Sequence, residues 1–319
     1  MTRAATHAGT WYSNSTARLK KDIHAFLGAT DAQKPTQSHL ARMIVAPHAG
    51  YRYSGNVIGQ AYRAVSSFSL PHVKKAESKD EKPIRRIFVF GPSHFYATKQ
   101  CDLSPFSEFN TPLGTIASDH DVIAALRATK LFGETTAKQD EREHSIEMQL
   151  PFIRAQFPNV PIVPILVGNL TRAAELRYAS ALLPYLLDPS TRVVVSSDFC
   201  HYGPRYDFTP RPSKAMSPRA FVETLDMHAI HAISTRSATT FTATLRTHPN
   251  TICGRHAISL VLEVITQGGF IKNTPPPVRM LAYAQSHTPA THKHDDGDDD
   301  NDDDEDDTNF VSYAALALL

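Results

Sequence analysis

The sequence predicts an α/β fold, in which a central β-sheet is flanked by helices. Three apolar runs typical of buried strands each lead into small or turn-forming residues and then a histidine. The runs cover residues 42–46, 86–90 and 192–197, and the histidines are His48, His94 and His201. In an open α/β sheet, the loops after the carboxyl ends of the strands converge on one edge, where ligands bind. The pattern therefore predicts a metal-type site at that edge.

The 319 residues are enough for one large α/β domain or two modest ones. A hydrophobic content of 41% with 20% charged residues is ordinary for a globular protein. No apolar run approaches the roughly 20 residues that span a bilayer, and the first residues lack the apolar core of a signal peptide. We therefore expect no membrane insertion and a cytoplasmic or nuclear location. The three scattered cysteines are expected to be reduced thiols.

Helices are predicted where apolar residues recur every three to four positions. The first shows this spacing in Leu19, Ile23, Phe26 and Leu27. The predicted helices cover residues 16–28, 55–66, 119–129, 143–153, 171–187, 219–233, 236–246 and 255–267. In the fourth of them, Pro151 is expected to bend or interrupt the helix.

Further strands complete the predicted sheet. Residues 161–168 form a buried apolar run, and residues 101–117 contain short strand-like pieces separated by prolines. Residues 278–286 and 310–318 are predicted to pair as a terminal hairpin.

Three segments are predicted to be insertions outside the core. Residues 73–86 are highly charged, and residues 203–218 are rich in proline and arginine, so both are interpreted as surface loops. Residues 292–307 contain a long acidic run that cannot bury apolar area, and we expect this insertion to be disordered.

The near-neutral formal charge of +1 hides a basic body. Eleven of the 32 acidic residues lie between Asp295 and Asp307, so the remaining 21 face 33 basic residues, a net charge of +12. A basic body can attract nucleic acid. No dense basic and aromatic cluster is present, however, and we expect no nucleic-acid partner.

Imidazole and thiolate are the ligands that borderline and soft metals prefer. His48 and His94 occupy equivalent loops after strands predicted to be neighbours, and Cys253 is the favoured third donor. Gly254 allows a turn there, and a helix is predicted to begin just after it. A thiol near a helix N-terminus and beside Arg255 has a lowered pKa. The alternative is that each is an ordinary structural histidine or core cysteine.

A second set of residues could perform acid–base chemistry. Asp198 and His201 follow a strand end, where the carboxylate could orient the imidazole. His144 and Glu147 are three residues apart on a predicted helix and could be partners that orient metal ligands. The sequence contains none of the glycine-rich nucleotide-phosphate fingerprints and no GxSxG motif.

Six sequence blocks carry a resemblance to a known family. They cover residues 7–12, 46–51, 91–94, 143–148, 196–201 and 251–256. These blocks strongly resemble the Memo family (mediator of cell motility), and the similarity runs in order from about residue 4 to the C-terminus. Residues 283–286 and 311–315 resemble the closing strands of that family.

The resemblance implies a single domain over residues 1–319, with a central mixed β-sheet flanked by helices, as in the class III extradiol non-haem iron dioxygenases. It also implies that iron or copper is the cofactor, and a thiolate ligand would be compatible with zinc as well. The implied metal ligands are His48, His94 and Cys253, and the implied pocket residues are His201, Asp198 and His144. His201 would match the acid–base histidine of the dioxygenases.

Three functions are compatible with this resemblance. The first is a metal-binding redox protein linked to oxidant production, metal homeostasis and cell motility signalling. The second is a dioxygenase-like or hydrolytic enzyme acting on a small aromatic substrate. The third is an adaptor that binds phosphotyrosine peptides or signalling proteins without catalysis. Dioxygenases complete their metal site with a carboxylate, whereas this chain offers Cys253, so ring-opening activity is not expected.

Overall fold

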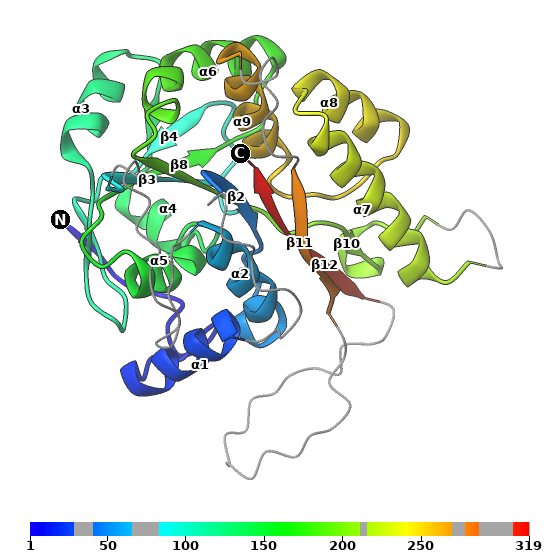
Figure 1. Ribbon diagram of the computed structural model, residues 1–319, viewed down its shortest axis with the longest axis horizontal. Helices are drawn as coiled ribbons and strands as arrows, with labels where there is room; N and C mark the ends of the chain where they lie inside the picture. Colours follow the sequence, from blue (N-terminus) through cyan, green and yellow to red (C-terminus); the bar gives the residue numbers. More distant parts are fainter. Residues whose placement is uncertain (29–40, 66–82, 211–215, 270–277, 287–308, 319) are drawn as a thin grey trace.

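The computed structural model describes residues 1–28, 41–65, 83–210, 216–269, 278–286 and 309–318, and a nine-stranded sheet forms their centre (Figure 1). Its strands are β2 (Met43–Ala46), β3 (Arg86–Pro92), β4 (Cys101–Leu103), β7 (Gly133–Glu134), β8 (Ile162–Val167), β9 (Thr191–Ser196), β10 (His201–Tyr202), β11 (Arg279–Gln285) and β12 (Phe310–Leu318). A smaller sheet joins β1 (Thr2–Arg3), β5 (Glu108–Phe109) and β6 (Ile116–Ala117).

The large sheet is mixed, as predicted. Its order is β10-β12-β2-β9-β3-β8-β4-β7. Strand β11 pairs with the edge of β12 that faces away from β2. Strands β2, β9, β3 and β8 are parallel, whereas β12 is antiparallel to β2 and forms the predicted terminal hairpin with β11. The expectation that β2 and β3 are neighbours was wrong, because β9 pairs with both and lies between them. The carboxyl ends of β2, β9 and β3 therefore meet in a row.

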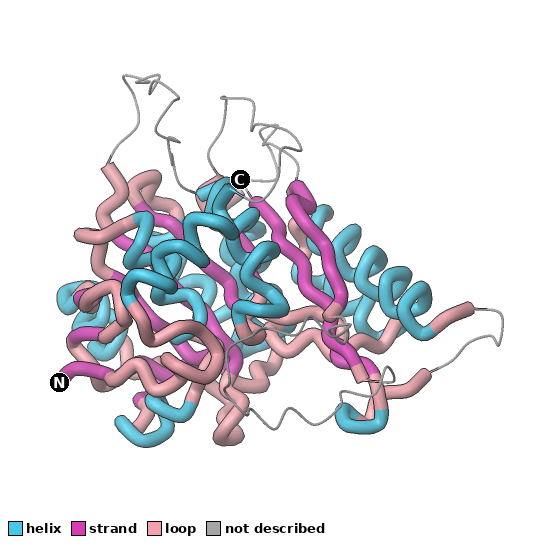
Figure 2. Tube along the Cα trace, turned by 90° about the horizontal axis from the view of Figure 1, so that it is seen from below, coloured by secondary structure: helices cyan, strands magenta, loops and turns pink. Residues whose placement is uncertain are grey.

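Helices cover both faces of this sheet (Figures 1 and 2). They are α1 (Thr16–Gly28), α2 (Tyr51–Val65), α3 (His120–Ala128), α4 (Ala137–Arg142), α5 (Leu150–Gln156), α6 (Arg172–Leu186), α7 (Pro218–Ser234), α8 (Ala238–Thr247) and α9 (Arg255–Gln267). Helices α1, α2 and α5 contribute to one apolar cluster with the inner residues of the sheet. Helices α3 and α6 to α9 contribute to the other, on the opposite face.

The predicted helix over residues 143–153 was wrong. Helix α4 ends at Arg142, residues 143–146 are not helical, and a short 3-10 turn (Glu147–Gln149) precedes α5. Pro151 lies in the first turn of α5, where its missing N–H costs no hydrogen bond, so it helps to begin a helix rather than interrupt one. His144 is consequently on a non-helical segment and does not share a helix face with Glu147. Helix α2 also begins four residues earlier than expected, at Tyr51.

The predicted insertions lie largely at the borders of the described residues. Of residues 73–86, only the last four are described, and β3 begins at Arg86. Of residues 203–218, the described part contains a 3-10 turn at Pro204–Tyr206 and the start of α7. The acidic insertion at residues 292–307 lies outside the described residues.

Helices α1 and α2 cross at Gly59. A Cβ at this position would lie 2.2 Å from the carbonyl oxygen of Phe26, which is backbone and cannot rotate away. We expect Gly59→Ala to force the helices apart and lower the free energy of unfolding by about 2–3 kcal/mol, measured by urea denaturation. Gly28→Ala is the control, since a Cβ there would meet nothing within 4 Å. Equal stability of the two variants would contradict this close crossing.

Candidate metal centre

The strand ends bring His48 and Cys253 together, although they are far apart in the sequence. His48 follows β2 and is 1% exposed. Cys253 lies two residues before α9, and its Sγ is 3.2 Å from Nε2 of His48. The backbone N–H of Asp198, which follows β9, donates to the same sulfur at 3.2 Å. The sulfur and the ring nitrogen therefore face each other in a largely buried setting.

The hydrogen bonds around Ser196 fix the tautomer of His48. The Ser196 hydroxyl has one proton, which it donates to the carbonyl of Ser145 at 2.6 Å. It must therefore accept from Nε2 of Gln149 at 3.0 Å and from Nδ1 of His48 at 2.9 Å. With a proton fixed on Nδ1, the His48 ring turns Nε2 toward Cys253, where this nitrogen donates to the sulfur when it is protonated and offers its lone pair when it is not. This is the arrangement that a metal ligand needs.

A buried carboxylate orients His94 in the same way. Oε1 of Glu143 accepts from Nδ1 of His94 at 2.9 Å, and Oε2 accepts from its backbone N–H at 2.6 Å. Burial alone would raise the pKa of Glu143, but the hydrogen bonds and charge of His94 lower it to about 2. The carboxylate therefore accepts the Nδ1 proton and leaves Nε2 as the nitrogen of His94 that can interact with Cys253. Carboxylate–histidine pairs of this kind are typical of metal sites.

The thiol of Cys253 is predisposed to ionise. Burial raises its pKa, but the charge and hydrogen bond of His48 and the hydrogen bond of His94 outweigh this effect and lower the pKa to about 6. Burial lowers the pKa of His94, but the hydrogen bonds and charges of Cys253 and Glu143 outweigh this effect and raise the pKa to about 10. The imidazoles, rather than the Arg255 neighbour considered from the sequence, cause the shift at Cys253. A thiolate is the form that binds metals.

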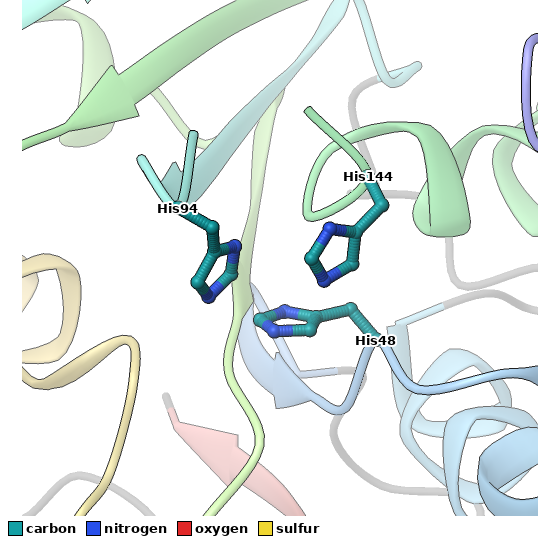
Figure 3. Close-up of side chains that lie close together, drawn as sticks. All are labelled: His48, His94 and His144. Atoms are coloured by element: carbon teal, nitrogen blue, oxygen red, sulfur yellow. The ribbon is translucent and has the colours of Figure 1, made fainter. Parts of the chain in front are cut away.

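His144 adds a third imidazole (Figure 3). The ligand nitrogens of His48, His94 and His144 all lie within 4.8 Å of one another, so these three residues could hold a metal ion. Burial and the neighbouring His48 lower the pKa of His144 to about 2, which keeps the ring neutral. Its support is looser than that of the other two rings, because Nδ1 is 3.5 Å from Oε1 of Glu143 and makes no hydrogen bond within the described residues.

His201 and Asp198 differ in their relation to a cavity beside this cluster. The cavity, of about 360 Å³, is lined by His201 together with His94 and Cys253, but not by Asp198 or His144. Nδ1 of His201 donates to the carbonyl of Phe199 at 3.1 Å, so this carbonyl, and not the Asp198 carboxylate, orients the ring. Oδ1 of Asp198 instead accepts from the backbone N–H of His48 at 2.8 Å. Burial raises the pKa of Asp198.

The N-terminal segment closes the cluster on the side of His144. Trp11 lies against His144, with ring centroids 4.5 Å apart. The segment is anchored by Glu147, which is 1% exposed and accepts from Arg3 Nη1 at 2.5 Å, from Tyr12 OH at 2.9 Å and from the backbone N–H of His7 at 2.8 Å. Burial would raise the pKa of Glu147, but His7 and Arg3 lower it to about 2.

Another buried carboxylate, that of Asp226 in α7, supports the loop that carries Cys253. Asp226 is fully buried and accepts from Ser312 at 2.5 Å, from Tyr283 at 2.8 Å and from Nδ2 of Asn250 at 2.8 Å. It thus ties the terminal hairpin to residue 250. Burial raises the pKa of Asp226 to about 6, against the lowering effect of these hydrogen bonds.

We expect Asp226 to make the protein less stable as the pH rises from about 4 to 6. Its unfolded pKa is about 3.8, so in this window the folded state holds a proton that the unfolded state has lost. The cost at neutral pH is on the order of 3 kcal/mol. Asp226→Asn should remove this pH-dependent loss in urea unfolding measured at pH 4 and 7, whereas Asp121→Asn, an exposed control, should keep it. An unchanged pH profile in Asp226→Asn would refute the assignment.

Sequence reasoning missed the groups that orient the metal-facing rings. These are Glu143, Ser196, Gln149 and Trp11. The sequence shows that Glu143 precedes His144. It does not show the hydrogen bond between Glu143 and His94, because these residues are 49 positions apart.

Comparison with known proteins agrees with the family resemblance found in the sequence. The profile of a family described as Memo-like protein matches residues 3–296. The chain is 34% identical over 289 residues to the memo-1 homolog of Caenorhabditis elegans, covering 90% of this chain and 77% of that one. It is 35% identical over 269 residues to the MEMO1 proteins of Xenopus laevis and Mus musculus, covering 83% of this chain and 84% of each relative.

A solved structure of an uncharacterized Escherichia coli K12 protein aligns with 73% of this chain and 86% of its own, at a TM-score of 0.40 and 11% identity. Among the described residues, no helix has both the length and the apolar character that a membrane crossing requires.

Proposed function

The chain belongs to the Memo family, and from that premise we propose that it is a cytoplasmic metal-binding protein in which His48, His94 and Cys253 hold an iron or copper ion. The observation that carries the proposal is the 3.2 Å separation between Cys253 Sγ and His48 Nε2, at the sheet edge where His94 also lies. This separation supports the proposal, because sharing one ion requires the sulfur to lie within about 6 Å of the two ring nitrogens, and Nε2 of His48 is one of them.

The donor set fits a transition metal in geometry and in charge. Two ligands of one tetrahedral ion, at about 2.0 Å for nitrogen and 2.3 Å for sulfur, lie roughly 3.5 Å apart, close to the spacing of Cys253 and His48. Each histidine has its Nδ1 proton engaged, by Ser196 or by Glu143. The thiolate would supply a negative charge that offsets the cation. His144, a neutral imidazole beside the pair, is available as a further donor.

The ligand chemistry narrows the choice of metal. Mixed thiolate and imidazole donors suit copper(I), iron and zinc, and disfavour magnesium and calcium. A bound iron or copper ion would supply one-electron redox chemistry, in keeping with the roles in oxidant production, metal homeostasis and cell motility signalling that the family resemblance implies. The residues of this chain would hold the ion, set its charge through Cys253 and limit access of water on the side of Trp11.

Elemental analysis of protein purified without chelators tests the proposal. We expect about one equivalent of iron or copper per chain in the wild type, and none in the double variant His48→Ala, Cys253→Ser. His228→Ala, which removes an exposed histidine of α7, is the control and should retain the metal. A double variant that still binds metal stoichiometrically would overturn the proposal.

A second candidate is a dioxygenase-like enzyme acting on a small aromatic substrate, and the position of His201 favours it. This ring lines the cavity together with Cys253 and His94, with Nδ1 engaged by Phe199. His201 could therefore exchange a proton with a bound molecule through Nε2. Oxygen-dependent turnover of catechol-type compounds that is lost in His201→Ala, with metal retained, would support this function; no turnover in the metal-loaded wild type would exclude it.

A third function, as an adaptor for phosphotyrosine peptides or signalling proteins, follows from the resemblance alone. Peptide binding that survives the loss of metal in the His48→Ala, Cys253→Ser variant would favour it.

A further inference from the structure

The cavity beside the candidate metal centre has the size of a small-molecule site. Its volume is about 360 Å³, at the lower end of the range for ligand pockets. Its lining residues include His94 and Cys253 of the candidate metal centre, together with His201 and Tyr206. The rings of His201 and Tyr206 meet edge to face, with centroids 5.2 Å apart. A single-ring compound fits this volume, whereas a folded peptide segment does not.

The described residues that line this cavity include several basic side chains and no carboxylate. They include one arginine, Arg255, and three histidines, His94, His201 and His256. No aspartate, glutamate or lysine is among the described residues that line it. Cys253, when ionised, would be the one anionic group among the acidic and thiol side chains of this described lining, and a bound metal ion would offset its charge. The cavity therefore favours an anion over a neutral or cationic molecule.

Arg255 is the permanently charged cation among the described residues that line this cavity. It is the first residue of α9 and is exposed. Within the described part of the chain, its guanidinium bonds only the carbonyl of Ile252, at 3.3 Å, and pairs with no carboxylate. A guanidinium presents a planar fork of donors that matches the two oxygens of a carboxylate. The N-terminal end of α9 adds a smaller positive potential in the same place.

We propose that this cavity binds a small aromatic carboxylate, with Arg255 receiving the carboxylate group and the ring lying beside His201 and Tyr206. A carboxylate is favoured over a phosphate because phosphate sites commonly gather several arginines, whereas a single arginine matches a single charge. This inference deepens the proposed function, since it names the class of molecule that would approach the metal. The contact with Arg255 itself does not depend on the metal.

Titrations with three matched probes test the proposal, monitored by calorimetry or ligand-observed NMR on the full chain. The probes are benzoate, its neutral analogue benzamide, and phenyl phosphate. We expect benzoate to bind at least about fivefold more tightly than benzamide, and Arg255→Gln to remove most of this preference. Arg142→Gln, which alters an exposed arginine outside the lining residues of the cavity, should preserve it. Equal binding of benzoate and benzamide, or an unchanged preference in Arg255→Gln, would overturn the proposal.

The same titrations with and without one equivalent of Zn²⁺ separate this inference from the proposed metal function. Benzoate preference that depends on Arg255 in both conditions supports the cavity assignment even if metal binding fails. Stoichiometric zinc binding without benzoate preference refutes the cavity assignment alone. Tighter binding of phenyl phosphate than of benzoate would refute the choice of a carboxylate.

Discussion

Replacement of Glu147 by alanine is expected to lower the free energy of unfolding by about 3–5 kcal/mol, the usual cost of removing one partner of a buried ion pair. Glu147 is 1% exposed, and its carboxylate accepts hydrogen bonds from Arg3, His7 and Tyr12. Without it, the guanidinium of Arg3, itself 2% exposed, keeps Asp140 as a partner but loses a second anion. Urea denaturation at neutral pH measures the change.

Two further variants show whether the loss arises from the buried network. Glu134→Ala removes a surface partner of Arg127 and should cost less than about 1 kcal/mol. Glu147→Gln keeps the shape of the side chain but not its charge, and should fall between the wild type and Glu147→Ala. Because the segment that Glu147 anchors includes Trp11, the sole tryptophan, its fluorescence should shift in Glu147→Ala under native conditions. If Glu147→Ala were as stable as Glu134→Ala, the N-terminal segment would be held by contacts other than those of Glu147.

The sheet was predictable because its strands have a strong local pattern. Fully buried strands such as β8 (Ile162–Val167) are continuous apolar runs that end at recognisable turns. Their order was less predictable, because nothing local to β2 or β3 records that β9 inserts between them. The error at residues 143–153 has a similar origin. The local pattern favours a helix there, but Glu143 uses its carboxylate to hold His94 and Ser145, and the chain leaves the helical path at that point.

The residues of the candidate site also fall into a group that the sequence predicts and a group that it does not. A histidine after a strand end is visible in the sequence, so His48, His94 and His201 could each be placed at the sheet edge. The residues that set tautomer and charge act across long separations, as Ser196 does on His48 and Glu143 on His94. The role of His144 was missed as a possible donor because the predicted helix turned it toward Glu147, whereas the observed segment turns it toward His48 and His94. The orientation of the imidazole rings within the site therefore could not be predicted without the folded structure.

Cys253→Ser is expected to weaken metal binding by more than about 100-fold, because loss of a ligand should exceed the 10–100-fold effect of losing a partner that merely orients one. The serine hydroxyl is not ionised at neutral pH and is a poor ligand for a soft metal. His144→Ala is expected to weaken binding by less than about tenfold, since Nδ1 of its ring has no hydrogen-bond partner among the described residues to hold it in a ligating orientation. Competition with a chelator of known zinc affinity measures both changes.

Cobalt substitution distinguishes the two donor sets directly. A thiolate ligand gives Co²⁺ a sulfur-to-metal charge-transfer absorption, which should be present in the wild type and in His144→Ala and absent in Cys253→Ser. Cys101→Ala, which removes a buried thiol of β4, is the control and should keep the band. Wild-type Co²⁺ protein without this absorption, with binding lost in His144→Ala, would assign the ion to the three imidazoles of His48, His94 and His144 instead. In that case, Cys253 would act as a neighbouring thiol rather than as a ligand.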